Sequence, residues 1–568
     1  MLNDYTRGGQ LFLHKIRMLR QVWDKTLFGS FIVSSIVMLV FSYKELVGLD
    51  YPAGITYVKA HISEEVNGIF GKKTTRPKIT SLVKDGIYAK DISAKVVINH
   101  PGFKRKFSNI VEVYLNVGLH ILYLTIGILF FVIIIWSRVG SRAIRKDIIR
   151  GDKVLSDVEV AKILKKLGKA SNFVVADMPL VKDKETSHIL ITGTTGSGKS
   201  NCMHYLLPQI RKKDQQAVIV DFTGEMVDRY YDSSKGDIII NPYEQKAHSW
   251  DFWSEVKNPH NLSSISNSLF ATKGSNYDEM WNNVSKQFFE DATNIVLKSA
   301  NPTIKELYKI LAIDSLKEVS NKLKSTASSS VLDPKNERTA MSVRTNTIAF
   351  IEWMKDYNET EPSISLSYWF NAIKNEDEHE KGKWLFLTSS PSQRNRLQSF
   401  HSMLFDLILS HVMELGADPN RRLWFIIDEL PALKRLPSLP TALSEFRKYG
   451  GCIMAGVQSV NQLYKIYGQY EGLTMLDQFN TKFIFRTEEN NFANYICKNF
   501  GDIEYTESTE NYSYGAHEMR DGVSSSKVEK KKSLVNPSDL AALKDCEAYV
   551  KLPESSVRIA KIQIKYHQ

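Results

Sequence analysis

The stretch GTTGSGKS, residues 193–200, has the residue types and spacing of a phosphate-binding loop. It matches the pattern G-x-x-x-x-G-K-[ST]. Glycines let successive backbone N–H groups converge on phosphate oxygens, and a following helix adds its positive N-terminus. Lys199 is then expected to reach the β- and γ-phosphates, while the Ser200 hydroxyl binds Mg²⁺. The residues predicted to bind the nucleotide are Gly193, Thr194, Thr195, Gly196, Ser197, Gly198, Lys199 and Ser200.

Such a site also needs a carboxylate at the end of a second strand, and the run RRLWFIIDEL supplies one. Its apolar part ends in Asp428 and Glu429. Asp428 is predicted to hold Mg²⁺ through water, and Glu429 to orient or polarise the attacking water. Gln458, at the end of GCIMAGVQS, stands where such ATPases place a polar sensor of the γ-phosphate. The alternatives are a glycine-rich turn, an acidic start of a loop and a surface glutamine.

The elements that must position these groups are short apolar runs that alternate with helical stretches. HILIT precedes the glycine-rich loop, and NCMHYLLPQI follows it as a predicted helix. Further predicted strands are QAVIVDFTG, KWLFLTSS, GCIMAGVQS and TKFIFRT. Unbroken apolar runs suit central parallel strands that are buried on both faces. We therefore expect a doubly wound α/β sheet with the phosphate loop at the carboxyl ends of its strands.

Two uncharged apolar segments near the start predict a membrane anchor of two helices. Residues 26–43 contain 18 uncharged residues, and residues 113–137 contain 25. About 20 apolar residues cross a bilayer, so the second segment is long enough and the first slightly short. A signal peptide is the alternative for the first, but its apolar core is too long. Basic residues that flank both segments on the outside place both termini and most of the chain in the cytoplasm.

The composition of the 568 residues is that of a folded protein, with 43% hydrophobic and 24% charged residues. A net charge of +11 favours anionic partners such as nucleic acid or lipid headgroups, or is simply a solvated basic surface. Cys202, Cys452, Cys497 and Cys546 are scattered without metal-ligand spacing, so we assign them no chemistry. The isolated histidines His188, His204 and His401 are interpreted as structural.

Two long segments resemble the coupling-protein ATPases of type IV secretion and conjugation, the TraD/TrwB group. One runs from VIVDFTGEM to SWDFW, residues 218–253, and the other from FIIDELPAL to YKIYG, residues 425–468. The resemblance covers most of the predicted cytoplasmic part and extends to the paired N-terminal spans. It implies a RecA-like P-loop ATPase related to FtsK-type motors, with a parallel-rich central sheet, an inserted all-α subdomain and an N-terminal two-helix transmembrane anchor.

The resemblance also implies an activity and partners. Members of this group form membrane-anchored homohexamers that use ATP and Mg²⁺ to pass single-stranded DNA, often with an attached relaxase from the relaxosome, into a type IV secretion channel. Arg447 falls where the group places an arginine finger, which reaches the nucleotide of the neighbouring subunit. An arginine suits that role because it stays charged and its fork can stabilise a transferring phosphoryl group. The alternative for Arg447 is a solvated helix end.

We expect a helical insert within the ATPase domain, since WNNVSKQFFEDATNIVL repeats apolar residues at helical spacing. DGVSSSKVEKKKS, residues 521–533, is interpreted as a flexible basic loop. Arg394 and Arg396 are candidates for lining a DNA channel. The predicted parts are a cytoplasmic N-terminus (1–25), transmembrane helix 1 (26–43), a periplasmic segment (44–112), transmembrane helix 2 (113–137), the first part of the nucleotide-binding domain (138–250), the all-α subdomain (251–370) and the second part (371–568).

Two other functions remain open from the sequence alone. One is a chromosomal translocase of duplex DNA of the FtsK/HerA kind, whose membrane anchors usually have a different number of spans. The other is a docking receptor that recruits protein substrates to a secretion apparatus, with ATP binding governing assembly. We expect no nuclease or protease chemistry.

Overall fold

The computed structural model describes residues 2–69, 78–80, 91–143, 147–244, 247–272, 276–359, 362–513 and 522–566. The chain forms two units. The first comprises residues 1–147 and 506–528, and the second comprises residues 148–505 and 529–568. The phosphate-binding loop and every predicted site residue lie in the second unit.

A ten-stranded sheet of order β4-β19-β18-β15-β7-β14-β13-β8-β12-β9 organises the second unit. The seven strands from β15 to β9 are parallel throughout, whereas β18 is antiparallel to both β15 and β19. The strands are β4 (Val154–Ser156), β19 (Ile559–Gln563), β18 (Glu547–Lys551), β15 (Thr481–Ile484), β7 (Ile189–Thr192), β14 (Gly451–Val457), β13 (Leu423–Ile427), β8 (Gln216–Asp221), β12 (Trp384–Thr388) and β9 (Ile238–Ile240).

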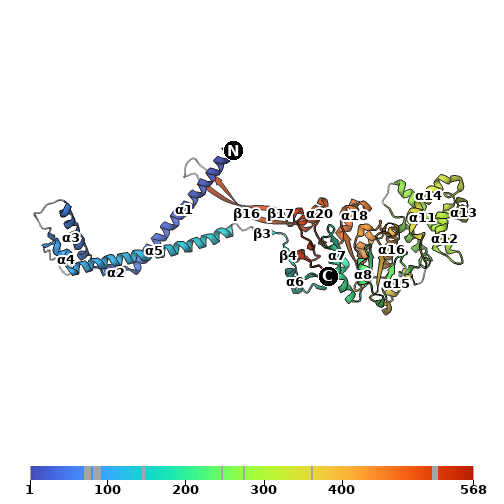
Figure 1. Cartoon of the computed structure of the whole chain (residues 1–568), viewed down its shortest axis with the longest axis horizontal. Coiled ribbons are helices and arrows are strands. Elements are labelled where there is room, and N and C mark those ends of the chain that lie inside the picture. The colour runs from blue at the N-terminus through green and yellow to red at the C-terminus, as the bar shows by residue number, and fades with distance from the viewer. Residues whose placement is uncertain are drawn as a thin grey trace. The chain divides into compact units, whose positions relative to one another are not determined.

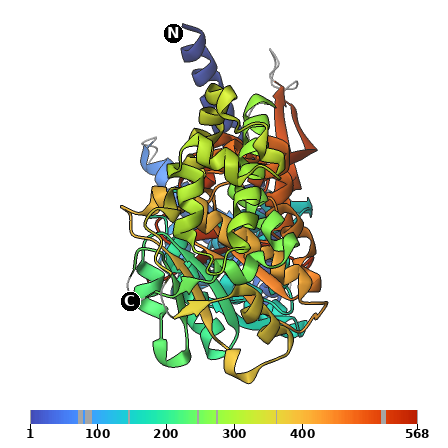
Figure 2. The ribbon, with the colours of Figure 1, turned by 90° about the vertical axis from the view of Figure 1, so that its right-hand side faces the viewer.

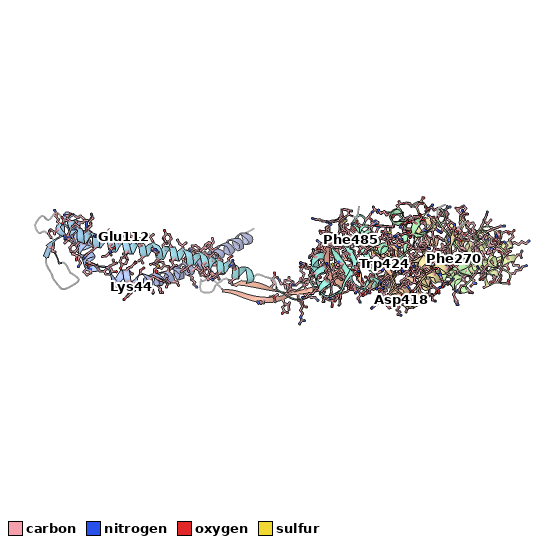
Figure 3. The ribbon with its side chains drawn as sticks, turned by 90° about the horizontal axis from the view of Figure 1, so that it is seen from below. Lys44, Glu112, Phe270, Asp418, Trp424 and Phe485 are labelled. Carbon is pink, nitrogen blue, oxygen red and sulfur yellow. The ribbon has the colours of Figure 1, made fainter. Side chains whose placement is uncertain are left out.

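The unbroken apolar runs form central strands because both faces of the sheet are covered. In β13, Phe425 belongs to one hydrophobic core and its neighbours Trp424 and Ile426 belong to the other. All five residues of this strand are buried. Trp424 and Phe485, which follows β15, are labelled in Figure 3 and belong to the same core. The predicted strands around the site are therefore all present.

Helices connect these strands. They include α6 (Asp157–Lys166), α7 (Lys199–Lys212), α8 (Glu225–Tyr230), α16 (Arg394–Glu414), α17 (Leu439–Glu445), α18 (Val460–Tyr467), α19 (Gln469–Gln478), α20 (Asn490–Phe500) and α21 (Pro537–Ala541). A small antiparallel pair, β5 (Ala170–Val175) and β6 (Met178–Val181), precedes the phosphate-binding loop. Parallel strands whose connections are helical place the loops after their carboxyl ends at one edge of the sheet.

Among the described residues, seven α-helices lie between β9 and β12, largely in the range predicted as an insert. They are α9 (Phe252–Val256), α10 (Pro259–Leu269), α11 (Asn276–Leu297), α12 (Ile304–Tyr308), α13 (Leu316–Lys322), α14 (Glu337–Ile351) and α15 (Leu366–Lys374). A parallel pair, β10 (Ser249–Trp250) with β11 (Ser363–Ile364), brings the two ends of this range together. Figures 1 and 2 show α11 to α14, in green to yellow, as one group. Phe288 and Phe289 of α11 are fully buried, as the helical spacing predicts.

The first unit contains the two apolar segments as parts of longer helices, α1 (Leu2–Phe41) and α5 (Pro101–Ala143). Within them, residues 16–41 and 101–139 are long and apolar enough to cross a membrane, with 18-residue windows of mean hydropathy 1.6 and 2.6. Lys44 and Glu112, labelled in Figure 3, bound the predicted intervening segment. This unit also contains α2 (Tyr43–Val47), α3 (Tyr51–Ile69), β1 (Lys78–Thr80), β2 (Asp91–Ser93) and α4 (Ala94–Asn99).

The prediction of a flexible loop at residues 521–533 is wrong. Of these residues, 522–533 form strand β17 (Gly522–Ser533), which belongs to a three-stranded sheet of order β17-β16-β3 with β16 (Asp502–Ser513) and β3 (Asp147–Arg150). Residues 526–532 of this strand are exposed. Backbone pairing with a neighbouring strand does not require an apolar face, so a polar strand of this kind has no alternating hydrophobic pattern by which to recognise it.

Candidate active site

The glycine-rich loop turns between the end of β7 and the start of α7, and two of its glycines are required by close packing. A Cβ at Gly193 would lie 2.6 Å from the Cβ of Phe485. A Cβ at Gly198, where φ is +110°, would lie 3.1 Å from the Cα and the sulfur of Cys546. The Thr194 N–H donates to the carbonyl of Arg486 over 2.8 Å, and the loop is thereby held against the residues after β15.

Lys199 and Ser200 begin α7 and point toward the strand ends. The Lys199 ammonium donates to the Thr194 carbonyl over 2.9 Å, which folds the side chain back over the loop. Burial lowers the pKa of Lys199, and the charges of Glu429 and Asp428 oppose that change. The Ser200 hydroxyl donates to the Asp428 carboxylate over 3.1 Å. The predicted pair of Mg²⁺-binding groups is therefore in direct contact.

Asp428 and Glu429 follow β13 in partly buried positions. Burial raises the pKa of Asp428, and the Ser200 hydrogen bond opposes this effect. Burial also raises the pKa of Glu429, to about 7. One Glu429 oxygen accepts from the Gln458 N–H over 3.4 Å, and the other is buried without a hydrogen-bond partner. The Gln458 side chain accepts from the Thr195 hydroxyl over 3.0 Å, so it lies beside the loop, as a phosphate sensor must.

A cavity of about 290 Å³ lies among these groups. It is lined by Thr195, Gly196, Gly198, Lys199, Ser200, Asn201, His204, Glu225, Arg229, Asp428, Gln458 and Tyr566. The site fits a nucleoside triphosphate with Mg²⁺, because it combines a glycine-walled loop, a lysine and a Ser–Asp oxygen pair. Two buried oxygens without partners, on the Thr194 hydroxyl and Glu429, mark polar groups that the protein alone does not satisfy.

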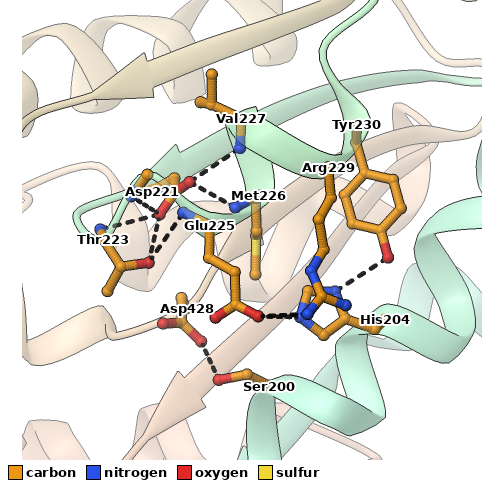
Figure 4. A network of polar contacts seen from close by, with 11 residues as sticks. Ser200, His204, Asp221, Thr223, Glu225, Met226, Val227, Arg229, Tyr230 and Asp428 are labelled. Carbon is orange, nitrogen blue, oxygen red and sulfur yellow. Dashed lines mark hydrogen bonds and ion pairs between the residues drawn. The ribbon is translucent and has the colours of Figure 1, made fainter. Parts of the chain in front are cut away.

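Figure 4 shows a network beside this cavity that the sequence analysis did not identify. Asp221, fully buried at the end of β8, accepts five hydrogen bonds. These come from the Thr223 N–H and hydroxyl and from the N–H groups of Gly224, Met226 and Val227. Asp221 thus fixes the start of α8. The available signal was its place at the carboxyl end of a predicted strand adjacent to β13 in the sheet.

Helix α8 in turn presents Glu225 to the cavity. The Glu225 carboxylate lies 3.2 Å from the His204 Nε2 and 3.3 Å from the Arg229 guanidinium. His204 is buried on α7, one turn after Ser200, and its Nδ1 lies 3.0 Å from the Tyr230 hydroxyl. The interpretation of His204 as structural overlooks that it also lines the cavity. By contrast, His188 and His401 are buried in the interior and line none of it.

Comparison with known families decides what kind of protein contains this site. The family model of the type IV secretion-system coupling protein DNA-binding domain matches residues 172–565. The chain belongs to this family. Among curated relatives, this coupling protein is 29% identical to coupling protein TraD of Escherichia coli (strain K12), over 99% of this chain and 78% of TraD. It is 26% identical to protein VirD4 of Agrobacterium fabrum over 24% of this chain and 21% of VirD4.

Solved structures of the conjugative coupling protein TrwB have the same fold. A form of TrwB in complex with sulphate is 25% identical, with a TM-score of 0.64 over 74% of this chain and 95% of that one. TrwB in complex with ADP and Mg²⁺ is 24% identical, with a TM-score of 0.63 over 75% and 96%. The predicted family and the RecA-like P-loop fold are therefore confirmed. With its two apolar helices, the TraD homology also indicates an inner-membrane protein.

In the isolated chain of the coupling protein, Arg447 lies outside the lining of the cavity of its own subunit, and it is predicted to serve that of a neighbour. It is exposed on a 3₁₀ turn, Phe446–Lys448, after α17. Arg447 does not belong to the residues that line the cavity. An arginine finger that acts on a neighbouring subunit has to be exposed in this way, so the geometry is compatible with the prediction, which stays a prediction.

The two arginines considered for DNA contact differ in their surroundings. Arg396 is paired with Glu352 at 3.1 Å and with Asp356 at 3.3 Å. Arg394 stacks over the Phe222 ring at 5.1 Å and lines a cavity of about 610 Å³. Glu429 also lines this cavity, together with three further cationic residues, Lys434, Arg435 and Lys465. Of the two arginines, Arg394 is therefore better placed to contact a phosphate.

Proposed function

We propose that this chain is an inner-membrane ATPase coupling protein that uses ATP hydrolysis to move single-stranded DNA, bound to a relaxase, into a type IV secretion channel. The observation that supports it is the set Lys199, Ser200, Asp428 and Gln458 around one cavity, in a chain of the coupling-protein family. Glu429 joins this set through the hydrogen bond that it accepts from the Gln458 N–H. TrwB in complex with ADP and Mg²⁺, and in complex with a non-hydrolysable ATP analogue, supports ATP and Mg²⁺ as the cofactors.

The residues of the site would divide the reaction among them. Lys199 and the loop amides would bind and orient the phosphates, and Ser200 and Asp428 would hold the metal, Asp428 through water. Bound Mg²⁺ would neutralise charge on the β- and γ-oxygens. Glu429 orients the attacking water with its unpartnered oxygen, and Gln458 contacts the γ-phosphate. Arg447 of a neighbouring subunit would stabilise the charge that develops on the transferred group.

We further propose the membrane topology and assembly that this activity requires. Residues 26–43 and 113–137 would cross the membrane, with 44–112 in the periplasm and residues 1–25 in the cytoplasm together with the nucleotide-binding domain (138–250 and 371–568). The subdomain 251–370 would belong to the same cytoplasmic part, and six copies would form a ring around the DNA. Support comes from the basic residues outside both apolar helices and from the TraD homology.

The test is ATP turnover by the full-length protein in lipid nanodiscs, without DNA, with single-stranded DNA and with duplex DNA, while the oligomeric state is followed by light scattering. We expect turnover that single-stranded DNA stimulates and that accompanies hexamer formation. Lys199→Ala is the control that should eliminate all turnover. Stimulation by duplex DNA alone would instead indicate a duplex translocase. Turnover that ignores DNA but responds to a secreted protein would indicate a docking receptor.

A further inference from the structure

Residues 564–566, which follow β19, pass beside α7, the helix after the phosphate-binding loop, and reach the nucleotide cavity. The Lys565 carbonyl accepts from the Asn201 amide over 2.8 Å and from the Tyr205 hydroxyl over 3.2 Å. The Ile564 N–H donates to the Cys546 carbonyl over 2.8 Å. Two hydrogen bonds thus hold this short segment against α7 and a third joins it to Cys546, and the next residue, Tyr566, lines the cavity.

The turn that receives this segment is itself built into the phosphate-binding loop. The Cys546 N–H donates to the Ser197 carbonyl over 2.9 Å, with Cys546 at a φ of +62°. Asp545 pairs with Arg486 at 2.9 Å, and the Arg486 carbonyl accepts from the loop at Thr194. Strain of this kind persists only where the surroundings fix the backbone. Tyr566 is therefore attached to a rigid part of the site.

The position of Tyr566 along the cavity distinguishes it from the groups that act on phosphate. Ser200 and His204, one turn apart on α7, face Asp428 and Glu225. The next face of α7 carries Asn201 and, one turn later, Tyr205. The Lys565 carbonyl accepts hydrogen bonds from both. Metal and γ-phosphate chemistry belongs to the first face, so Tyr566, which follows the docked Lys565, lies on the side of the cavity left for the remainder of the nucleotide.

The Tyr566 ring is available for a ligand. Its side chain is 68% exposed although its backbone neighbours are hydrogen-bonded. A hydrogen bond with the Cys546 thiol places the phenol oxygen at the turn that contains Cys546 and raises the pKa of the Tyr566 hydroxyl. Tyr566 is also the one Phe, Tyr or Trp among the described residues that line this cavity.

We propose that the Tyr566 ring stacks on the base of the bound nucleotide and so forms the base subsite of the ATPase. The proposal rests on the proposed function, since it assumes that the cavity binds a nucleoside triphosphate. Stacking of a base on an aromatic side chain contributes enough free energy to change an affinity by about tenfold. The phosphate groups gain nothing from it, so the effect depends on the base.

The experiment compares two ligands by calorimetry on the full-length protein in nanodiscs: ATP with Mg²⁺, and inorganic tripolyphosphate with Mg²⁺. Tyr566→Ala should raise the Kd for ATP by about tenfold and leave the Kd for tripolyphosphate unchanged. Tyr566→Phe should bind ATP like the wild type, because the ring remains. Tyr470→Ala is the matched control, since Tyr470 is an 89% exposed tyrosine on α19 outside the cavity lining.

Two results would overturn the subsite. One is an unchanged ATP affinity in Tyr566→Ala, and the other is an equal loss for both ligands, which would make Tyr566 a support of the loop. Failure of the proposed function has a different signature, in which the wild-type protein binds neither ligand and Lys199→Ala changes nothing.

Discussion

The Ser200 hydroxyl lies 3.1 Å from the Asp428 carboxylate, although 228 positions separate the two residues in the chain. The contact exists because α7 starts after β7 and Asp428 follows β13, and both strands end at the same edge of a parallel sheet. A direct Ser–Asp contact with a partly buried carboxylate is suited to sharing one divalent cation. The predictions that follow start from this pair.

Loss of the Asp428 charge should weaken the use of Mg²⁺ more than the binding of phosphate. In Asp428→Asn the Mg²⁺ concentration for half-maximal turnover should rise by roughly tenfold or more. This is the usual loss when a residue that holds a metal indirectly, through a ligand of the metal such as water, is removed. A magnesium titration of ATP turnover measures this. An unchanged midpoint would remove Asp428 from the metal site.

Lys199→Ala and Glu429→Gln should separate binding from hydrolysis. Both should lower turnover by roughly 10² or more, the scale of a lost general base or phosphate clamp. Only Glu429→Gln should still bind ATP, because its neighbours Lys199 and Asp428 keep their phosphate and metal contacts. Filter binding of labelled ATP alongside turnover distinguishes the two variants. Wild-type hydrolysis in Glu429→Gln would show that another group activates the water.

Arg447 should act on the subunit next to its own. Arg447→Ala alone is expected to lose roughly 10³ in turnover, the lower range for an arginine finger. Mixed with Lys199→Ala protomers, it should recover part of the activity. In such a mixture the intact nucleotide site of an Arg447→Ala subunit can lie next to the intact Arg447 of a Lys199→Ala subunit. Lys448→Ala, which removes the adjacent exposed cation, is the matched control and should behave like the wild type. A mixture as inactive as its components would argue for a role within one subunit.

DNA stimulation should depend on Arg394 and not on Arg396. Both lie near the start of α16, but Arg396 is already neutralised by Glu352 and Asp356. In Arg394→Ala we expect the DNA concentration for half-maximal stimulation to rise several-fold. The dependence of DNA affinity on salt concentration should become less steep, by about the amount that one phosphate contact contributes. Arg396→Ala serves as the control of equal charge. Equal effects of the two variants would mean that general charge, and not this cavity, attracts DNA.

His188 should make stability sensitive to acid. Its Nδ1 accepts from the Ile453 N–H, and its Nε2 lies 3.1 Å from the Leu443 carbonyl. Burial lowers its pKa from 6.5 to about 4. Between these values the unfolded chain binds a proton that the folded chain does not, so the free energy of unfolding falls as the pH falls. The stabilisation is complete above pH 6.5 and decreases by about 3 kcal/mol down to pH 4.

Denaturant unfolding at several pH values, compared between the wild type and His188→Gln, measures this contribution. The variant should be less stable at pH 7, and the difference between the two proteins should shrink toward pH 4. A constant difference would show that His188 does not change protonation on unfolding.

The contiguous parts of the site could be predicted from the sequence. The loop at residues 193–200 is a local pattern, and local backbone geometry requires its glycines. Asp428 could be paired with it because unbroken apolar strands imply a parallel sheet, whose carboxyl ends share an edge. The apolar helices and the helical insert follow from length and periodicity in the same way.

Only the tertiary structure decided the contacts between segments that are far apart in the sequence. Asp221 looks like any acid after a strand, and its role appears only when the amides of α8 converge on it. Tyr566 lies far along the chain from the loop and reaches it through the β18–β19 pair and the turn at Cys546. Strand β17 pairs within a sheet although its residues 526–532 are exposed, and such pairing requires no apolar face. Such features depend on which surfaces meet, and no local pattern encodes that.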